Sequence, residues 1–556
     1  MRRPFLSLFW AAALLSGSLL SSSCMAPGEP QTNSQTNWYR TCKSKLECGD
    51  LDCICGACTS LCSDLTDCRE GASMCLAITD ERADSFCEGA ALQRPVCVQT
   101  CDDSSCPSGT TCKDGVCLIE PPPDEVVKVD LSERYQKLVG FGASLAFAER
   151  DIIGHDDQEK LYELLFRDLN INVIRLGNHY EAGRETNLEL TVELLEALIE
   201  RVGSEPTLLM TEGSPPAALK KNGAKACDGD EGSCTLATLD DDSFDYAGLA
   251  EHWRESLEAY AEVGIKPDYL SIQNNPNWSP PEGHSGDACR LLPTEGTTEL
   301  NGKEIRLAGY LEAAQAVLDE IKDLPDPPRL YGPETTTLNA VPRYEPVLAE
   351  GLLAAVAIHM YGANVENPRR DEMNVVRALA AEYDLPVFQS EAMNEGLETA
   401  TLIHTAMVEG NATVYLQNDF VSPVGALDPN QNAFIQLEEE GYTIQGPYYA
   451  MQHFSAHTGP GWTRVFAAAE KGGLLTSAWI APDEEALTVV LVNTGTEPLV
   501  TDLDLDEERK TLTSSSVTQT VYTPSLEHKN LGALPKDGRI EIPAQSTVTV
   551  ALTKGS

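Results

Sequence analysis

The sequence predicts an α/β protein in which a (β/α)8 TIM barrel has a β-sandwich domain beside it and a small disulfide-rich module before it. Three observations predict this organisation. Eight strand-like runs, most of them followed by a helix-like run, lie between residues 136 and 416. Short alternating strands separated by turn residues follow residue 462. Of the 18 cysteines, fourteen fall between Cys42 and Cys117.

The composition limits the possible partners. The chain has 556 residues, with 86 acidic against 40 basic side chains and a formal net charge of -46. Nucleic acids and anionic membrane surfaces repel such a chain, which excludes them as binding partners. A chain of this length is also expected to contain two or three domains.

The first 24 residues have the pattern of an export signal. Arg2 and Arg3 precede an apolar run over 5–20, and small residues lead to Cys24. Cys24 resembles the lipidated cysteine of bacterial lipoproteins, and ordinary secretion with cleavage nearby is the alternative. Residues 25–40 would then form a flexible linker. We therefore expect an exported protein, either a lipoprotein at the outer membrane or cell surface or a secreted one, with a lipid anchor as its only membrane contact.

The cysteines of an exported chain predict disulfides, here in a module over 41–118. Zinc sites are the alternative, but Cys55 and Cys58 form the one CxxC pair of this region, which has no histidine. Cys227 and Cys234 flank an acidic loop and are expected to pair with each other. If Cys24 carries lipid, the remaining count is odd and leaves Cys289 unpaired. The role of the module is open between a spacer and an adhesion unit.

A proline-rich linker, 119–125, separates the module from the predicted barrel, 136–445. A strand at 126–135 is expected to join the β-sandwich, 446–556. The barrel strands are expected at 136–144, 172–176, 207–211, 269–273, 329–331, 355–359, 386–390 and 412–416. Helices are expected at 157–166, 188–201, 246–263, 307–321, 373–383 and 399–408.

In a barrel of parallel strands, ligands bind beyond the carboxyl ends of the strands. One such end carries the amides Asn274 and Asn275 with Trp278, and another delivers Glu391 directly after an apolar run. A carboxylate in this place can attack an anomeric carbon, and Arg175 and Tyr361 can keep it ionised. Each of these residues also has an ordinary structural explanation: Glu391 as a solvated loop carboxylate, and His359 as a core histidine.

Several short motifs occur in the order of one enzyme family. They are Gly140-Phe141-Gly142-Ala143-Ser144, Ser214-Pro215-Pro216-Ala217, Gln273-Asn274-Asn275-Pro276, Gly332-Pro333-Glu334, His359-Met360-Tyr361 and Ser390-Glu391. This set resembles glycoside hydrolase family 30, a retaining group that includes glucosylceramidases and xylanases. The resemblance covers roughly 126–553 and implies a barrel with a side β-sandwich, β-linked glycans as substrates, no cofactor and no metal. It also implies Glu391 as the nucleophile, and Arg175, Asn274, Trp278, His359 and Tyr361 in the substrate site.

The chain departs from the family at the fourth strand. The family has Q-N-E-P there, with the glutamate as general acid/base, and this chain has Asn275 in its place. An amide cannot protonate a leaving oxygen, so the expected activity is weak or altered. Glu212, Glu282 or Glu334 could replace the lost acid. A non-catalytic carbohydrate-binding protein is the second hypothesis, and a structural surface protein is the third.

Overall fold

A computed structural model describes residues 38–555, except 41, 43, 69–71, 88–91, 102–105, 107–109, 120–122, 146–148, 182–187, 228, 230–231, 281, 283–285, 301, 426–432, 506–511 and 536–537. The chain divides into two compact units, residues 1–122 and residues 123–556. The predicted signal segment with Cys24 and most of the linker that follows it lie outside the described residues. In the described part, no helix combines the length and the apolar character that crossing a bilayer requires.

The first unit is held together by disulfides and three small two-stranded antiparallel sheets. Their strands are β1 (Asp52–Ile54) with β2 (Ala57–Thr59), β3 (Met74–Leu76) with β4 (Val96–Val98), and β5 (Thr110–Lys113) with β6 (Val116–Ile119); a helix, α1 (Arg82–Phe86), accompanies them. The bonds are 42–53, 48–58, 55–87, 62–75, 68–97, 101–112 and 106–117. The CxxC pair thus enters two different disulfides. Such a module can fold with little apolar core.

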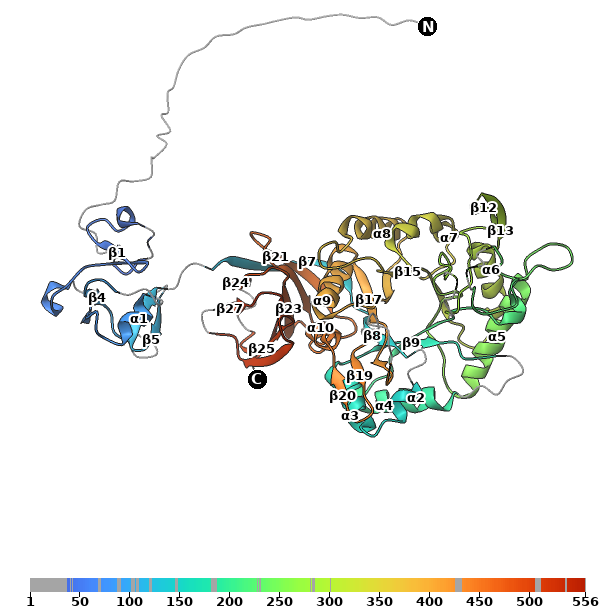
Figure 1. Cartoon of the computed structure of the whole chain (residues 1–556), viewed down its shortest axis with the longest axis horizontal. Helices are drawn as coiled ribbons and strands as arrows, with labels where there is room; N and C mark the ends of the chain where they lie inside the picture. The colour runs from blue at the N-terminus through green and yellow to red at the C-terminus, as the bar shows by residue number, and fades with distance from the viewer. Residues whose placement is uncertain are drawn as a thin grey trace, which may run out of the picture. The chain divides into compact units, whose positions relative to one another are not determined.

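The second unit contains a closed barrel, whose eight parallel strands follow the order β10-β11-β14-β15-β16-β17-β8-β9. Each of these strands overlaps one of the eight expected runs. Figure 1 labels β8, β9, β15 and β17 among them. Their bounds are β8 Gly140–Ser144, β9 Val173–Gly177, β10 Thr207–Thr211, β11 Tyr269–Leu270, β14 Arg329–Thr335, β15 Ala355–His359, β16 Val387–Glu391 and β17 Ala412–Gln417. Pairing of Val414 in β17 with Gly140 in β8 closes the ring.

Gly142 shows why the first strand motif is rich in glycine. A Cβ atom at this position would lie 1.7 Å from the carbonyl oxygen of Val173 on the neighbouring strand β9. Any larger residue would therefore force β8 and β9 apart.

Helices surround the barrel and bury their apolar faces against it (Figure 1). They are α2 Glu149–Ile153, α3 Gln158–Tyr162, α4 Glu189–Val202, α5 Tyr246–Glu262, α6 Tyr310–Ile321, α7 Glu345–Ala349, α8 Arg370–Glu382, α9 Gly396–His404 and α10 Gly446–Ser455. Helices α3 and α9 continue directly as short π-helical segments, Glu163–Asp168 and Thr405–Glu409. Two small sheets were not expected from the sequence: the hairpin β12 (Gly296–Leu300) and β13 (Lys303–Leu307), and the sheet β18 (Val421–Ser422), β19 (Ile435–Leu437) and β20 (Tyr442–Ile444).

The last domain is one nine-stranded sheet in the order β26-β25-β28-β23-β22-β21-β7-β24-β27. The bounds are β7 Glu125–Lys137, β21 Thr463–Ala469, β22 Leu475–Ile480, β23 Ala486–Asn493, β24 Leu499–Leu505, β25 Ser514–Val521, β26 Glu527–Gly532, β27 Arg539–Ile542 and β28 Ser546–Thr553. The sheet curls, because the edge strand β27 also contacts β23 and β28, and one apolar core fills the space between its two halves. The two halves of the curled sheet thus pack face to face, as the two sheets of a β-sandwich do.

The expected run over 136–144 is two strands rather than one. β7 ends in the sheet domain at Lys137, and β8 begins in the barrel at Gly140. Between them, the backbone amide of Leu138 donates to the carbonyl of Trp462, and the backbone amide of Val139 donates to the carbonyl of Thr413 in the barrel. The backbone thus changes its pairing partner at this point. At the other boundary, helix α10 lies between barrel and sheet, so the first strand of the sheet after the barrel starts at Thr463 and not near 446.

Candidate functional site

A cavity of about 810 Å³ opens at the carboxyl ends of the barrel strands. This size suits a small ligand or one or two sugar rings. Among the residues that line it are seven of the sequence candidates: Arg175, Glu212, Asn274, Asn275, Trp278, Tyr361 and Glu391. Glu391 and Asn275 thus share one hollow, as the resemblance to family 30 implies.

Glu391 is the last residue of β16 and is held as an anion at the floor of the cavity. Its Oε2 accepts a hydrogen bond from Nη1 of Arg175 at 2.8 Å, and its Oε1 accepts one from the hydroxyl of Tyr361 at 2.5 Å. Burial tends to raise the pKa of this carboxyl, but His359, Arg175 and the Tyr361 hydroxyl outweigh burial and hold the pKa below its usual value. The result is an oriented, ionised carboxylate.

Arg175 connects three strand ends. Besides Glu391, its Nη2 contacts Oε1 of Glu334 at 3.2 Å and donates to Oδ1 of Asn274 at 2.8 Å. Because the oxygen of Asn274 is engaged, its amide presents N–H groups to a ligand. One cation therefore holds two carboxylates and an amide in fixed positions.

Glu334 lies beneath the cavity and is fully buried. It occupies a bulge of β14 with a positive φ of 54°, which turns its side chain into the barrel interior. Burial alone would raise its pKa, but Arg175 and His359 lower it, and the hydroxyl of Thr211 donates to its Oε2 at 2.7 Å. This carboxylate stays ionised and supports Arg175.

Asn275, at the position of the family's acid/base, is fixed through its side-chain oxygen. Nδ1 of His359 lies 2.9 Å from this oxygen, and the hydroxyl of Thr336 donates to it at 3.1 Å. His359 itself is fully buried below the lining. The amide nitrogen of Asn275 is therefore the atom that this residue can offer to a ligand, and it carries no proton that it can give up.

The remaining candidates for a replacement acid have different surroundings. Glu212 lines the cavity, but both of its oxygens lie 3.1–3.2 Å from Nε2 of His252. Burial raises the pKa of Glu212, and His252 opposes the rise. Glu282 is exposed and is absent from the described lining.

Trp278 is positioned by the disulfide loop. Cys227 and Cys234 are bonded, as the sequence predicts, and together with Ala288 they pack against the half-buried indole. The backbone amide of Trp278 donates to the backbone carbonyl of Asn275 at 2.9 Å. An aromatic ring on the cavity wall is the surface on which the apolar face of a sugar stacks. Cys289, next to this loop, is a free buried thiol.

The cavity also contains Asp419, two residues beyond β17, to which the sequence assigned no role. The sequence places Asp419 at a strand end but does not show how its carboxyl is buried. Among the described residues, every group of three possible metal ligands consists of module cysteines, all of them disulfide-bonded.

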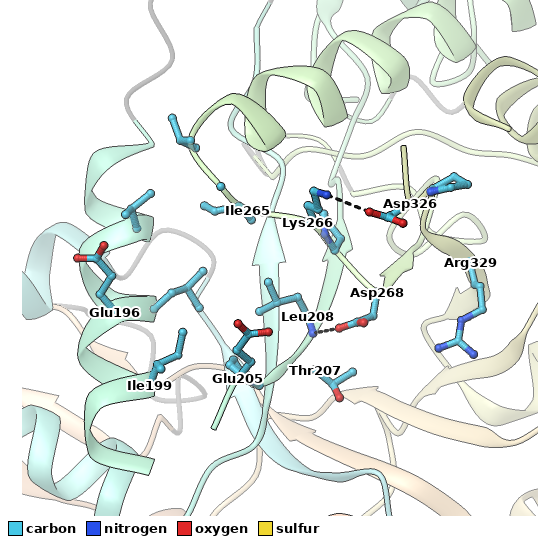
Figure 2. A pocket seen from close by; sticks show the side chains of 17 residues that line it. Glu196, Ile199, Glu205, Thr207, Leu208, Ile265, Lys266, Asp268, Asp326 and Arg329 are labelled. Atoms are coloured by element: carbon cyan, nitrogen blue, oxygen red, sulfur yellow. Dashed lines mark hydrogen bonds and ion pairs between the residues drawn. The ribbon is translucent and has the colours of Figure 1, made fainter. Parts of the chain in front are cut away.

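A larger hollow, of about 950 Å³, lies at the opposite end of the barrel, where β10, β11 and β14 begin (Figure 2). Three of its charged side chains are engaged: Lys266 pairs with Asp326 at 3.0 Å, and Asp268 accepts from the amide of Leu208 at 2.9 Å. This end of a barrel serves stability, so the smaller cavity at the carboxyl ends is the candidate site.

Known structures share this architecture. The catalytic domain of a GH30 xylanase C from Talaromyces cellulolyticus superposes with a TM-score of 0.61 at 17% identity, covering 77% of this chain and 100% of that one. This is the fold of glycoside hydrolase family 30. A conserved exported protein from Bacteroides fragilis matches with a TM-score of 0.62 at 17% identity (77% and 100% covered), and an endo-β-1,6-glucanase with 0.56 at 14% (78% and 96%). No protein-family model matches the sequence.

Proposed function

We propose that the protein is an exported glycoside hydrolase that acts on β-linked glycans by a retaining mechanism with Glu391 as nucleophile. The observation that carries this proposal is the ionised carboxylate of Glu391, held by Arg175 and Tyr361 at the floor of a strand-end cavity. The fold shared with xylanases and a β-glucanase supports a glycan as the substrate. The eight disulfides of the described residues support an oxidising, extracellular location. Lipid attachment at Cys24 stays a prediction from the sequence.

In the first step, an oxygen of Glu391 attacks the anomeric carbon while the glycosidic C–O bond breaks, and the leaving oxygen departs with the bonding electron pair. The hydroxyl of Tyr361 and the guanidinium of Arg175 fix the attacking carboxylate, and Trp278 provides a stacking surface for the sugar. The N–H groups of Asn274 and Asn275 can donate to sugar hydroxyls. In the second step, water displaces Glu391 from the sugar and restores the configuration.

Asn275 determines how fast these steps can run. General acid/base assistance contributes about 10²–10⁴-fold to such reactions, and the amide provides none from the family's position. Without a replacement acid elsewhere in the cavity, the rate would depend strongly on how well the leaving group departs. Substrates with an acidic leaving group, which needs no proton, should react best.

The test uses the full exported chain with 2,4-dinitrophenyl β-glycosides of xylose and glucose, with proton NMR to identify the first anomer released. Hydrolysis with retention is expected. Glu391→Gln should abolish it, whereas Glu395→Gln, which changes an exposed glutamate four residues away, should leave it intact.

A carbohydrate-binding protein without catalysis gives a different result. Xylan or β-glucan oligosaccharides would then bind in titration calorimetry, the wild-type chain would turn over neither aryl glycoside, and Glu391→Gln would not alter binding. That outcome would overturn the hydrolase proposal.

A further inference from the structure

Asp419 is a second carboxyl group on the wall of the same cavity. It follows β17, the strand next to β16, and the amide of the preceding residue, Asn418, donates to the carbonyl of Ala392 at 2.8 Å. Ala392 in turn follows Glu391. Asp419 and Glu391 therefore leave neighbouring strand ends, which are spaced by about 4.8 Å in a sheet. Both carboxyl groups line one cavity, and retaining catalysis uses a pair of carboxyl groups in one site.

The two carboxyl groups have opposite surroundings. Glu391 receives hydrogen bonds from Arg175 and Tyr361 and is ionised. For Asp419, burial and the negative charge of Glu391 raise the pKa to about 8, with Glu149 of α2 adding to the rise and Arg175 opposing it. At neutral pH one group is thus an anion and the other carries a proton. When the pKa values of two neighbouring carboxyl groups are pushed apart in this way, one group can act as the acid and the other as the nucleophile.

Asp419 is also unengaged. Within the described part of the chain, no residue donates a hydrogen bond to its carboxyl or forms an ion pair with it, and the side chain is partly open to the cavity. Of the other acids near the site, Glu334 is held by Arg175 and Thr211, Glu212 is held by His252, and Asp287 is exposed to solvent. Asp419 therefore combines a raised pKa with a carboxyl group that no described residue binds.

We propose that Asp419 is the general acid/base of this protein and supplies from the end of β17 the proton that Asn275 cannot supply from the end of β11. This inference rests on the proposed function and names a catalytic group for the same cavity.

The proton balance is as follows. While Glu391 forms its bond to the anomeric carbon, the glycosidic bond breaks toward the leaving oxygen, which takes the proton of Asp419 and departs as an alcohol. Asp419 is then a carboxylate. It accepts a proton from the incoming water as the water oxygen bonds to the anomeric carbon and Glu391 departs. Both carboxyl groups return to their starting states, and no other reactant is needed.

The experiment compares wild type, Asp419→Asn and Asp156→Asn, a matched change at an exposed position outside the cavity. For each protein, kcat/KM is measured from pH 5 to pH 10 on phenyl and 2,4-dinitrophenyl β-glycosides of xylose and glucose. For wild type, we expect activity on the phenyl glycoside to fall as the pH rises through about 8, because the acid loses its proton. Asp419→Asn should lose about 10²–10⁴-fold on the phenyl glycoside and only a few-fold on the dinitrophenyl glycoside, and the alkaline fall should vanish. Asp156→Asn should match wild type.

Each contrary outcome has its own meaning. The inference is overturned if Asp419→Asn keeps wild-type activity on the phenyl glycoside, if it loses both activities equally, or if wild type hydrolyses only the dinitrophenyl glycoside. In those cases, labelling of Glu391 by a 2-fluoro glycoside would show that the proposed function still stands. If wild type hydrolyses neither substrate and Glu391 is never labelled, the proposed function fails, and the inference fails with it.

Discussion

Replacement of Arg175 by methionine should destabilise the protein more than any ordinary surface change. The guanidinium has two buried carboxylate partners, Glu391 at 2.8 Å and Glu334 at 3.2 Å, and its own side chain is 3% exposed. Methionine fills a similar volume but leaves both carboxylates without their cation. Breaking a buried ion pair by removing one partner costs about 3–5 kcal/mol. We therefore expect a loss of about 3–5 kcal/mol in the free energy of unfolding at pH 7.

The pH dependence of this loss has a definite sign. Arg175 helps to hold the pKa values of Glu334 and Glu391 below that of an unfolded glutamate. The stabilisation that it provides is therefore complete above the unfolded pKa, and it is lost as the pH falls through the pKa values of the folded protein. In the variant, burial favours the protonated carboxyls instead. The difference between wild type and Arg175→Met should therefore shrink as the pH is lowered from 7 to 4.

The assay is urea unfolding followed by near- and far-ultraviolet circular dichroism. Arg254→Met is the control, because Arg254 forms its ion pairs with Glu258 and Glu320 at the surface, where each is worth up to about 1 kcal/mol. If Arg175→Met unfolds within 1 kcal/mol of wild type at pH 7, the description of Arg175 as the cation that holds the site together is incorrect.

Three further changes test the site. Tyr361→Phe removes the hydroxyl that donates to Glu391, so the pKa of Glu391 should rise and the acid limb of the pH–rate profile should move to higher pH. Asn275→Glu, made in the Asp419→Asn background, returns a carboxyl to the family position and should restore about 10²–10⁴-fold of activity on phenyl glycosides, whereas Asn275→Gln should restore none. Asp419→Asn should also change stability: the raised pKa penalises the folded wild type increasingly as the pH climbs from about 4 to about 8, so the variant should become relatively more stable over this range in urea titrations.

The sequence predicts the fold well because the barrel and the sheet depend on local patterns. Apolar runs alternating with helical ones are enough to locate eight parallel strands, and the spacing of Cys227 and Cys234 is enough to pair them. Boundaries are less predictable. The run 136–144 reads as one strand, yet the chain leaves the sheet at Lys137 and enters the barrel at Gly140, a change of partner that only the packed structure determines.

The location of the site is predictable from the sequence, but the burial of its carboxyl groups is not. Strand ends identify Glu391 and Asn275 as neighbours of one cavity. The sequence cannot show that the bulge of β14 buries Glu334 beneath the floor, or that Glu282 points to solvent. Nor can it reveal the raised pKa of Asp419, since that depends on burial and on the charge of Glu391 across neighbouring strands.

Covalent trapping tests the central claim most directly. The full chain is incubated with 2,4-dinitrophenyl 2-deoxy-2-fluoro β-glycosides of xylose and glucose, then digested and mapped by mass spectrometry. We expect one sugar to be attached, through an ester, to the peptide that carries Glu391, and none to be attached to Glu391→Gln. Attachment at another carboxylate, or release of dinitrophenol by wild type without any covalent adduct, would contradict it.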